Sequence, residues 1–317
     1  MIVQVVGQFL DAILFGLLPG FGQSMSHRVF IGLLARFGAV LLFAKVFEID
    51  DIVHGGSIWP SKQGPSTGVL CGGKLCKTFV MTNSKNSTRL DRTQYFLRNH
   101  WQLLVMTALV FAFWSSTIAF PIRILIVFLH ELSHAIAAVV TGGKVLELTL
   151  SPLEGGSATT LGGNFFFIAS AGYLGSLLIG LGILFLAVRT DLDRWIVAAL
   201  GALLLGLTLW YFRTKFAFGF GVISGAVLLI AARFGGIILC DLILRVIGLT
   251  SIIYVPYDII SDTLLRSSSR SDARNIAETF GGPTVFWGGL WLVLSLLAIA
   301  AAARYGLGER SNISFRR

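Results

Sequence analysis

The sequence predicts an all-α polytopic membrane protein with about six to seven core transmembrane helices and a small β-hairpin. Hydrophobic residues make up 55% of the 317 residues and charged residues 13%, whereas an ordinary soluble domain is about 45–50% apolar. Apolar runs approaching the roughly 20 residues that cross a bilayer recur between residues 101 and 302. The net charge of +9 comes from Arg and Lys near segment ends, which suits anionic lipid head groups and predicts no nucleic-acid partner.

The N-terminal part of the chain has a different composition. Segments 2–19 and 28–48 are apolar but contain charged residues, so each is expected to be a membrane helix or an interfacial one. Gly, Ser, Lys, Asn and Thr dominate residues 48–98, which predicts a linker. The polar run that begins at Met81 is typical of an N-terminal tail. We therefore expect an extension or start-site artefact over residues 1–80, a polar tail over 81–100, a membrane-embedded domain over 101–303 and a C-terminal tail over 304–317.

Seven apolar stretches form the membrane-embedded domain. They cover residues 101–120, 121–141, 165–188, 195–212, 217–232, 235–255 and 285–302. Small residues over 170–176 allow close helix approach, so we expect that face to pack on the helix over 121–141. Asp241 and Arg245 lie four residues apart, which predicts an ion pair on one helix face. A polar loop rich in Ser and Arg is expected before the last span.

A short β-hairpin is predicted directly after the second apolar stretch. Residues 144–151 alternate apolar and polar side chains, and residues 155–163 are rich in Gly, Ser and Thr. Polar backbone at membrane depth is tolerated where it lines a cavity in the protein. We therefore expect the hairpin to lie beside the polar residues of the stretch over 121–141.

Those polar residues form the motif His130-Glu131-Leu132-Ser133-His134. Residues four apart stand on one helix face, so His130 and His134 can present ring nitrogens to a single metal ion. Glu131 projects about 100° round the helix, where it can reach a water on that metal without being a ligand. Zinc lowers the pKa of a bound water to about 7, and Glu131 would act as the general base that accepts its proton. The predicted reaction is peptide-bond hydrolysis.

Two other readings of this motif stay open, namely a chance match and a polar cluster satisfied by neighbouring helices. Each ionisable group at membrane depth costs about 2.5–3.5 kcal/mol on insertion scales, so His130, Glu131 and His134 together need a compensating partner. A bound metal ion supplies that partner.

A catalytic zinc commonly has three protein ligands and a water, so one ligand is missing. The other histidines, His27, His54 and His100, lie upstream and are poor candidates. Asp258 and Asp262 share one helix face at the end of an apolar stretch, and one of them should complete the site. Asp258 is favoured because it lies closer to the apolar run and follows Pro256, where the helix can kink.

The three cysteines, Cys71, Cys76 and Cys240, have no histidines at the spacing of a zinc site. No cysteine metal site is therefore expected. Cys71 and Cys76 are expected to be free thiols rather than a small disulfide loop.

These motifs resemble the site-2-protease family of intramembrane zinc metalloproteases, in its B-like branch, over residues 98–303. The resemblance rests on His130-Glu-Leu-Ser-His134-Ala with Thr141-Gly-Gly143, on Gly162-Gly163 with Ser170-Ala-Gly-Tyr-Leu-Gly175, and on Tyr257-Asp-Ile with Asp262 and Ser271-Asp-Ala273. It implies zinc held by both motif histidines and a downstream aspartate, with Glu131 as the base. The family's usual Leu-Asp-Gly motif flanks neither Asp258 nor Asp262.

The predicted function is therefore an intramembrane metalloprotease that uses Zn²⁺ and cleaves membrane proteins or peptides within or beside the lipid bilayer. A multi-pass protein of the bacterial inner membrane is expected. The alternative is a non-catalytic membrane scaffold or binding protein that retains the protease fold.

Overall fold

The computed structural model describes residues 84–265, 271–306 and 311–313. Its helices are α4 (Ser84–Phe113), α5 (Phe120–Val140), α6 (Phe165–Arg189), α7 (Asp193–Tyr211), α8 (Lys215–Phe234), α9 (Gly236–Ile260), α10 (Asp272–Phe280) and α11 (Thr284–Gly306), with the short turns η1 (Thr117–Ala119) and η2 (Ser261–Leu265). The predicted apolar segments over 2–19 and 28–48, the start at Met81, and Cys71 and Cys76 lie outside the described residues.

Six helical segments of the described chain are long and apolar enough to cross a membrane. They are Thr117–Val140, Phe165–Arg189, Asp193–Tyr211, Lys215–Phe234, Gly236–Thr263 and Thr284–Tyr305. This confirms an all-α membrane protein with six to seven core helices. Helix α4 is not among the six, although the sequence predicts a span over 101–120. The helix ends at Phe113, whose carbonyl oxygen accepts a hydrogen bond from Ser116 Oγ at 2.6 Å.

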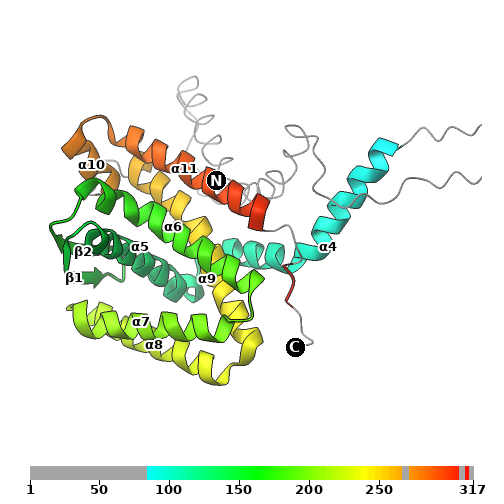
Figure 1. The fold of residues 1–317 in the computed structure, drawn as a ribbon, viewed down its shortest axis with the longest axis horizontal. Helices are drawn as coiled ribbons and strands as arrows, with labels where there is room; N and C mark the ends of the chain where they lie inside the picture. Colours follow the sequence, from blue (N-terminus) through cyan, green and yellow to red (C-terminus); the bar gives the residue numbers. More distant parts are fainter. Residues whose placement is uncertain (1–83, 266–270, 307–310, 314–317) are drawn as a thin grey trace, which may run out of the picture.

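Apart from α4, the helices form three groups (Figure 1). Helices α5, α6 and α9 lie in the middle, the antiparallel pair α7 and α8 packs on one side, and α10 and α11 pack on the other. The largest buried cluster joins α5 to α7, α8 and α9 through side chains such as Phe128, Leu204 and Leu244, none of which is exposed. Helix α5 is therefore enclosed by protein along most of its length.

Small residues bring α6 close to both of its neighbours. A Cβ added at Gly175 would meet Ser133 Cβ of α5 at 2.7 Å, and one added at Gly180 would overlap the side chain of Ser251 of α9. Only the absence of these side chains lets the helices approach so closely. The predicted packing of residues 170–176 on the motif helix is confirmed.

The predicted β-hairpin is present after α5. Strand β1 (Lys144–Leu150) pairs with β2 (Gly156–Leu161) in antiparallel register, and the buried Leu148 forms an isolated parallel bridge with Phe212 at the end of α7. The hairpin lies against α5 at the end of the bundle that also carries α10 (Figure 1).

The segment before the last span contains a helix, α10, where the sequence predicts a polar loop. In α10, Ser271 is the N-cap and its side-chain oxygen accepts a hydrogen bond from the backbone N–H of Arg274 at 3.3 Å. The inward-facing Ala273 and Ile276 are fully buried. This helix is short and mostly polar, so its stability depends on packing rather than on a long apolar run.

The predicted ion pair between Asp241 and Arg245 is confirmed, and it is buried in α9. Arg245 Nη2 donates to Asp241 Oδ2 at 3.2 Å, and Arg245 Nη1 donates to the backbone carbonyl of Ser311. The pair therefore ties α9 to residues 311–313 near the C-terminus.

This geometry predicts that Arg245→Met destabilises the protein by about 3–5 kcal/mol, because it leaves the Asp241 carboxylate buried without a compensating charge. Denaturant unfolding in detergent micelles measures the change. The double variant Asp241→Leu with Arg245→Met should recover most of the loss, since it removes both charges. Arg274→Met, which breaks the more exposed pair with Glu278, should cost less than about 1 kcal/mol. A loss for Arg245→Met no larger than that for Arg274→Met would contradict the prediction.

Candidate metal centre

The first two residues of the candidate site come from α5. Because this segment is helical throughout, His130 and His134 stand one turn apart on the same face, which is turned toward α6. Glu131 and His134 are buried, and the His130 side chain is 15% exposed. The motif therefore lies inside the protein and not on the lipid-facing surface.

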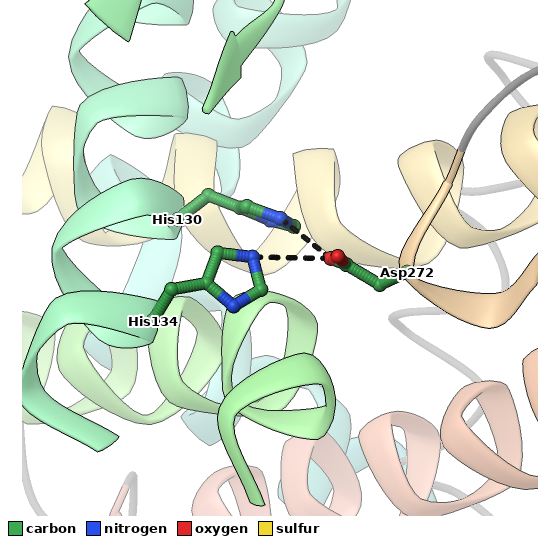
Figure 2. A group of neighbouring side chains, drawn as sticks. All are labelled: His130, His134 and Asp272. Atoms are coloured by element: carbon green, nitrogen blue, oxygen red, sulfur yellow. Dashed lines mark hydrogen bonds and ion pairs between the residues drawn. The ribbon is translucent and has the colours of Figure 1, made fainter. Parts of the chain in front are cut away.

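The third residue is Asp272, the first residue of α10. Its Oδ2 atom lies 3.0 Å from His130 Nε2 and 3.1 Å from His134 Nε2. Figure 2 shows the two imidazole rings and the carboxylate pointing toward one another from the two helices. One ligand atom from each residue lies within 4.8 Å of the others, and no other such group of three occurs among the residues that the structure describes.

The hydrogen bond of His134 Nδ1 determines which ring nitrogen faces Asp272. Its Nδ1 atom lies 2.6 Å from the backbone carbonyl oxygen of Ile168. A carbonyl can only accept, so Nδ1 carries the hydrogen and Nε2 of the neutral ring presents a lone pair toward Asp272. Two acceptors at 3.1 Å repel each other unless a cation, either a proton or a metal ion, lies between them.

The donor set fits zinc. Two imidazole nitrogens and one carboxylate oxygen are typical of catalytic zinc sites, and tetrahedral bonds of about 2.0–2.1 Å separate neighbouring ligand atoms by about 3.3 Å. The observed separations of 3.0 and 3.1 Å are close to that value. The bond from His134 Nδ1 to a carbonyl is also the outer contact that metal-binding histidines usually make.

Gly172 of α6 lies directly against the two imidazole rings. A Cβ at this position would overlap Nε2 of both His130 and His134. The space in front of the two nitrogens therefore exists because residue 172 has no side chain.

The electrostatics of Asp272 also favour a bound cation. Burial acts to raise the pKa of the Asp272 carboxyl, but with a proton between His134 and Asp272 the positive charge of His134 and the hydrogen bonds with both imidazoles hold that pKa well below its usual range. Asp272 also begins α10, where the positive end of the helix dipole stabilises a negative charge. The carboxylate is therefore kept ionised beside the two rings.

Glu131 lies on the neighbouring face of α5, against the hairpin. A Cβ added at Gly156, the first residue of β2, would lie 2.6 Å from Glu131 Oε1 and 2.9 Å from its Cδ. The backbone of β2 therefore covers the carboxylate directly and limits where it can turn.

The structure places the two predicted third ligands outside this group. Asp258 lies near the end of α9, which continues as a helix through Pro256, and Asp262 lies in η2, where its Oδ2 accepts a hydrogen bond from the Tyr173 hydroxyl at 2.7 Å. The structure instead brings Asp272 to the histidines. The signal available in the sequence was the N-cap Ser271 before Asp272, which marks the start of a helix.

A comparison with known families supports this description of the chain. Residues 103–302 match the family model described as Peptidase M50B-like, which confirms the resemblance to site-2 proteases. The matched range includes all of α5, α6 and α10 and therefore every residue of the candidate site. No curated protein and no solved structure matches the chain.

We predict that Gly172→Ala abolishes metal binding, because its methyl group would occupy the space in front of the two imidazole nitrogens. Elemental analysis of the purified protein gives the zinc content. Gly182→Ala, ten residues further along α6 in open space, is the matched control and should keep the wild-type zinc content. Equal zinc in the two variants would mean that the metal does not lie between the histidines and α6.

Proposed function

We propose that this chain, which belongs to the peptidase M50B-like family, is an intramembrane zinc metalloprotease in which His130, His134 and Asp272 hold the metal. The observation that carries the proposal is the convergence of both Nε2 atoms on Asp272 Oδ2, at 3.0 and 3.1 Å, within an integral membrane protein. The motif histidines and the aspartate come from helices far apart in the sequence. Their convergence on one point favours a metal site over a scattered polar cluster.

A zinc ion bound there supplies a Lewis acid that polarises a peptide carbonyl and lowers the pKa of a water to about 7. Glu131 would accept a proton from that water on a carboxylate oxygen and later return it to the leaving amine. Gly156 limits the rotation of the Glu131 carboxylate, and the carbonyl of Ile168 keeps the hydrogen of His134 on Nδ1. The residues of this chain thus fix both the base and the lone pairs that bind the metal.

The proposed substrates are membrane proteins or peptides cleaved within or beside the lipid bilayer. A helical backbone bonds its own carbonyl groups, so a substrate helix would have to unwind locally before a peptide bond could reach Glu131. Placement in a bacterial inner membrane stays a prediction.

A non-catalytic scaffold that retains the protease fold is the rival function. It predicts that the metal residues maintain structure and that Glu131 has no chemical role. The Glu131→Gln variant separates the two functions, because it keeps the shape of the side chain but cannot accept the proton. Zinc content should be unchanged, whereas hydrolysis of labelled single-span peptides in detergent micelles should fall at least about 100-fold. Equal hydrolysis by wild type and variant would favour the scaffold.

We predict that Asp272→Asn empties the site, because the amide is neutral and binds zinc far more weakly than a carboxylate. Asp258→Asn and Asp262→Asn should each retain zinc, since neither carboxylate belongs to the group around the histidines. Elemental analysis of the three purified variants decides among the three aspartates. Loss of zinc in Asp258→Asn or Asp262→Asn, with zinc retained in Asp272→Asn, would place the third ligand at the end of α9 or in η2.

A further prediction concerns the hairpin. Gly156→Ala should keep the zinc but lower peptide hydrolysis at least about 10-fold, because its methyl group would displace the Glu131 carboxylate and not the metal residues. Gly155→Ala is the control, since a Cβ there meets nothing within 4 Å. Equal activity in the two variants would show that the hairpin does not set the position of the base.

A further inference from the structure

Tyr173 of α6 lies beside the candidate metal centre and is only 1% exposed. Its ring meets the ring of His130 edge to face, with centroids 5.0 Å apart and planes at 82°. On its other side the Tyr173 ring packs against Trp291 of α11, with centroids 5.4 Å apart. The phenol ring is therefore held between α11 and the first metal-binding histidine.

The hydroxyl of Tyr173 is held by a hydrogen bond to Asp262. It donates a hydrogen bond of 2.7 Å to Asp262 Oδ2 in η2. A phenylalanine would fill almost the same space, so packing alone does not explain a phenol and a carboxylate here, where ionisable groups are costly. The turn that carries Asp262 is π-helical, a local geometry that often marks functional sites.

Helix α11 packs against η2. Gly288 lies so close to Thr263 that a Cβ at residue 288 would overlap the threonine side chain. Thr263 Oγ1 also donates to the backbone carbonyl of Ile259 at 2.6 Å. Asp262 is therefore presented to Tyr173 by a turn whose position is restrained by packing.

The two metal-binding histidines are oriented in different ways. The His134 ring is fixed by its hydrogen bond to the carbonyl of Ile168, whereas the His130 ring lies against the Tyr173 ring. Groups that orient a metal-binding imidazole tune metal affinity even though they do not touch the metal. The Tyr173 ring is the group that lies in this orienting position beside the His130 ring.

We propose that Tyr173 and Asp262 form a positioning pair that holds the His130 ring with Nε2 facing Asp272, and that neither of them binds the metal. Asp262 fixes the phenol through its hydroxyl, and the phenol ring restricts rotation of the imidazole. This inference rests on the proposed zinc site and assigns Asp262 a role outside the ligand set.

The test is the zinc affinity of the full-length protein, measured by competition with a chelator. Tyr173→Phe and Asp262→Ala should each weaken zinc binding about 10–100-fold while the site still fills at high zinc concentration. The double variant should be no weaker than the weaker single variant, because both changes break the same hydrogen bond. Asp262→Asn should restore near wild-type affinity, since its amide oxygen accepts the same bond.

Tyr211→Phe on α7 is the control for removing a tyrosine hydroxyl and should leave zinc affinity unchanged. Thermal unfolding of the zinc-free proteins provides the second readout. Variants that lose thermal stability but keep wild-type zinc affinity would overturn the inference, because the pair would then only hold α6 and η2 together. Loss of all zinc in Asp262→Ala with full affinity in Tyr173→Phe would also overturn it, because Asp262 would then be a ligand.

The wild-type protein separates this inference from the proposed function. A wild-type protein that binds no zinc overturns both. A wild-type protein that binds zinc no more tightly than the Tyr173→Phe and Asp262→Ala variants overturns the positioning role alone.

Discussion

The contact between the Asp272 carboxylate and the two imidazole nitrogens is the interaction on which the rest of the structure depends. Three ionisable groups at or near membrane depth would be costly if they were separate, at about 2.5–3.5 kcal/mol each on insertion scales. A cation held between them, as in the proposed zinc site, would offset that cost. His130 Nε2 and Asp272 Oδ2 belong to residues 142 positions apart, so this contact requires α5 and α10 to meet. Helix α6 contacts both α5 and α10 and so joins them.

Three glycines make close contacts around the site. Gly172 leaves room in front of the imidazoles, Gly175 lets α6 approach Ser133, and Gly156 lets the hairpin cover Glu131. Helix packing in a membrane depends on close van der Waals contact, because lipid is as apolar as the side chains it replaces. The same glycines that bring the helices together therefore also shape the space around the candidate metal ligands and Glu131.

Aromatic side chains hold α10 in place at the end of the bundle. Phe166 of α6 packs edge to face on Phe280 of α10, at 5.7 Å, and on Trp287 of α11, at 6.0 Å. These contacts fix a helix of nine residues that is too short to be stable alone. Apolar packing of α10 on its neighbours and the contact of Asp272 with the two histidines therefore act together to hold α10 in place.

The sequence by itself determined six of the seven predicted membrane spans, the β-hairpin, the motif helix and the pairing of Asp241 with Arg245. Each of these depends on composition or on residues a few positions apart, where helix and strand periodicity fix the geometry. The third carboxylate could not be chosen in this way, because Asp258, Asp262 and Asp272 all lie near the ends of helical segments and local spacing does not rank them. Only the tertiary structure distinguishes their positions: packing of α10 on α6 and α11 brings Asp272 to the histidines, while the Asp262 carboxylate accepts a hydrogen bond from Tyr173.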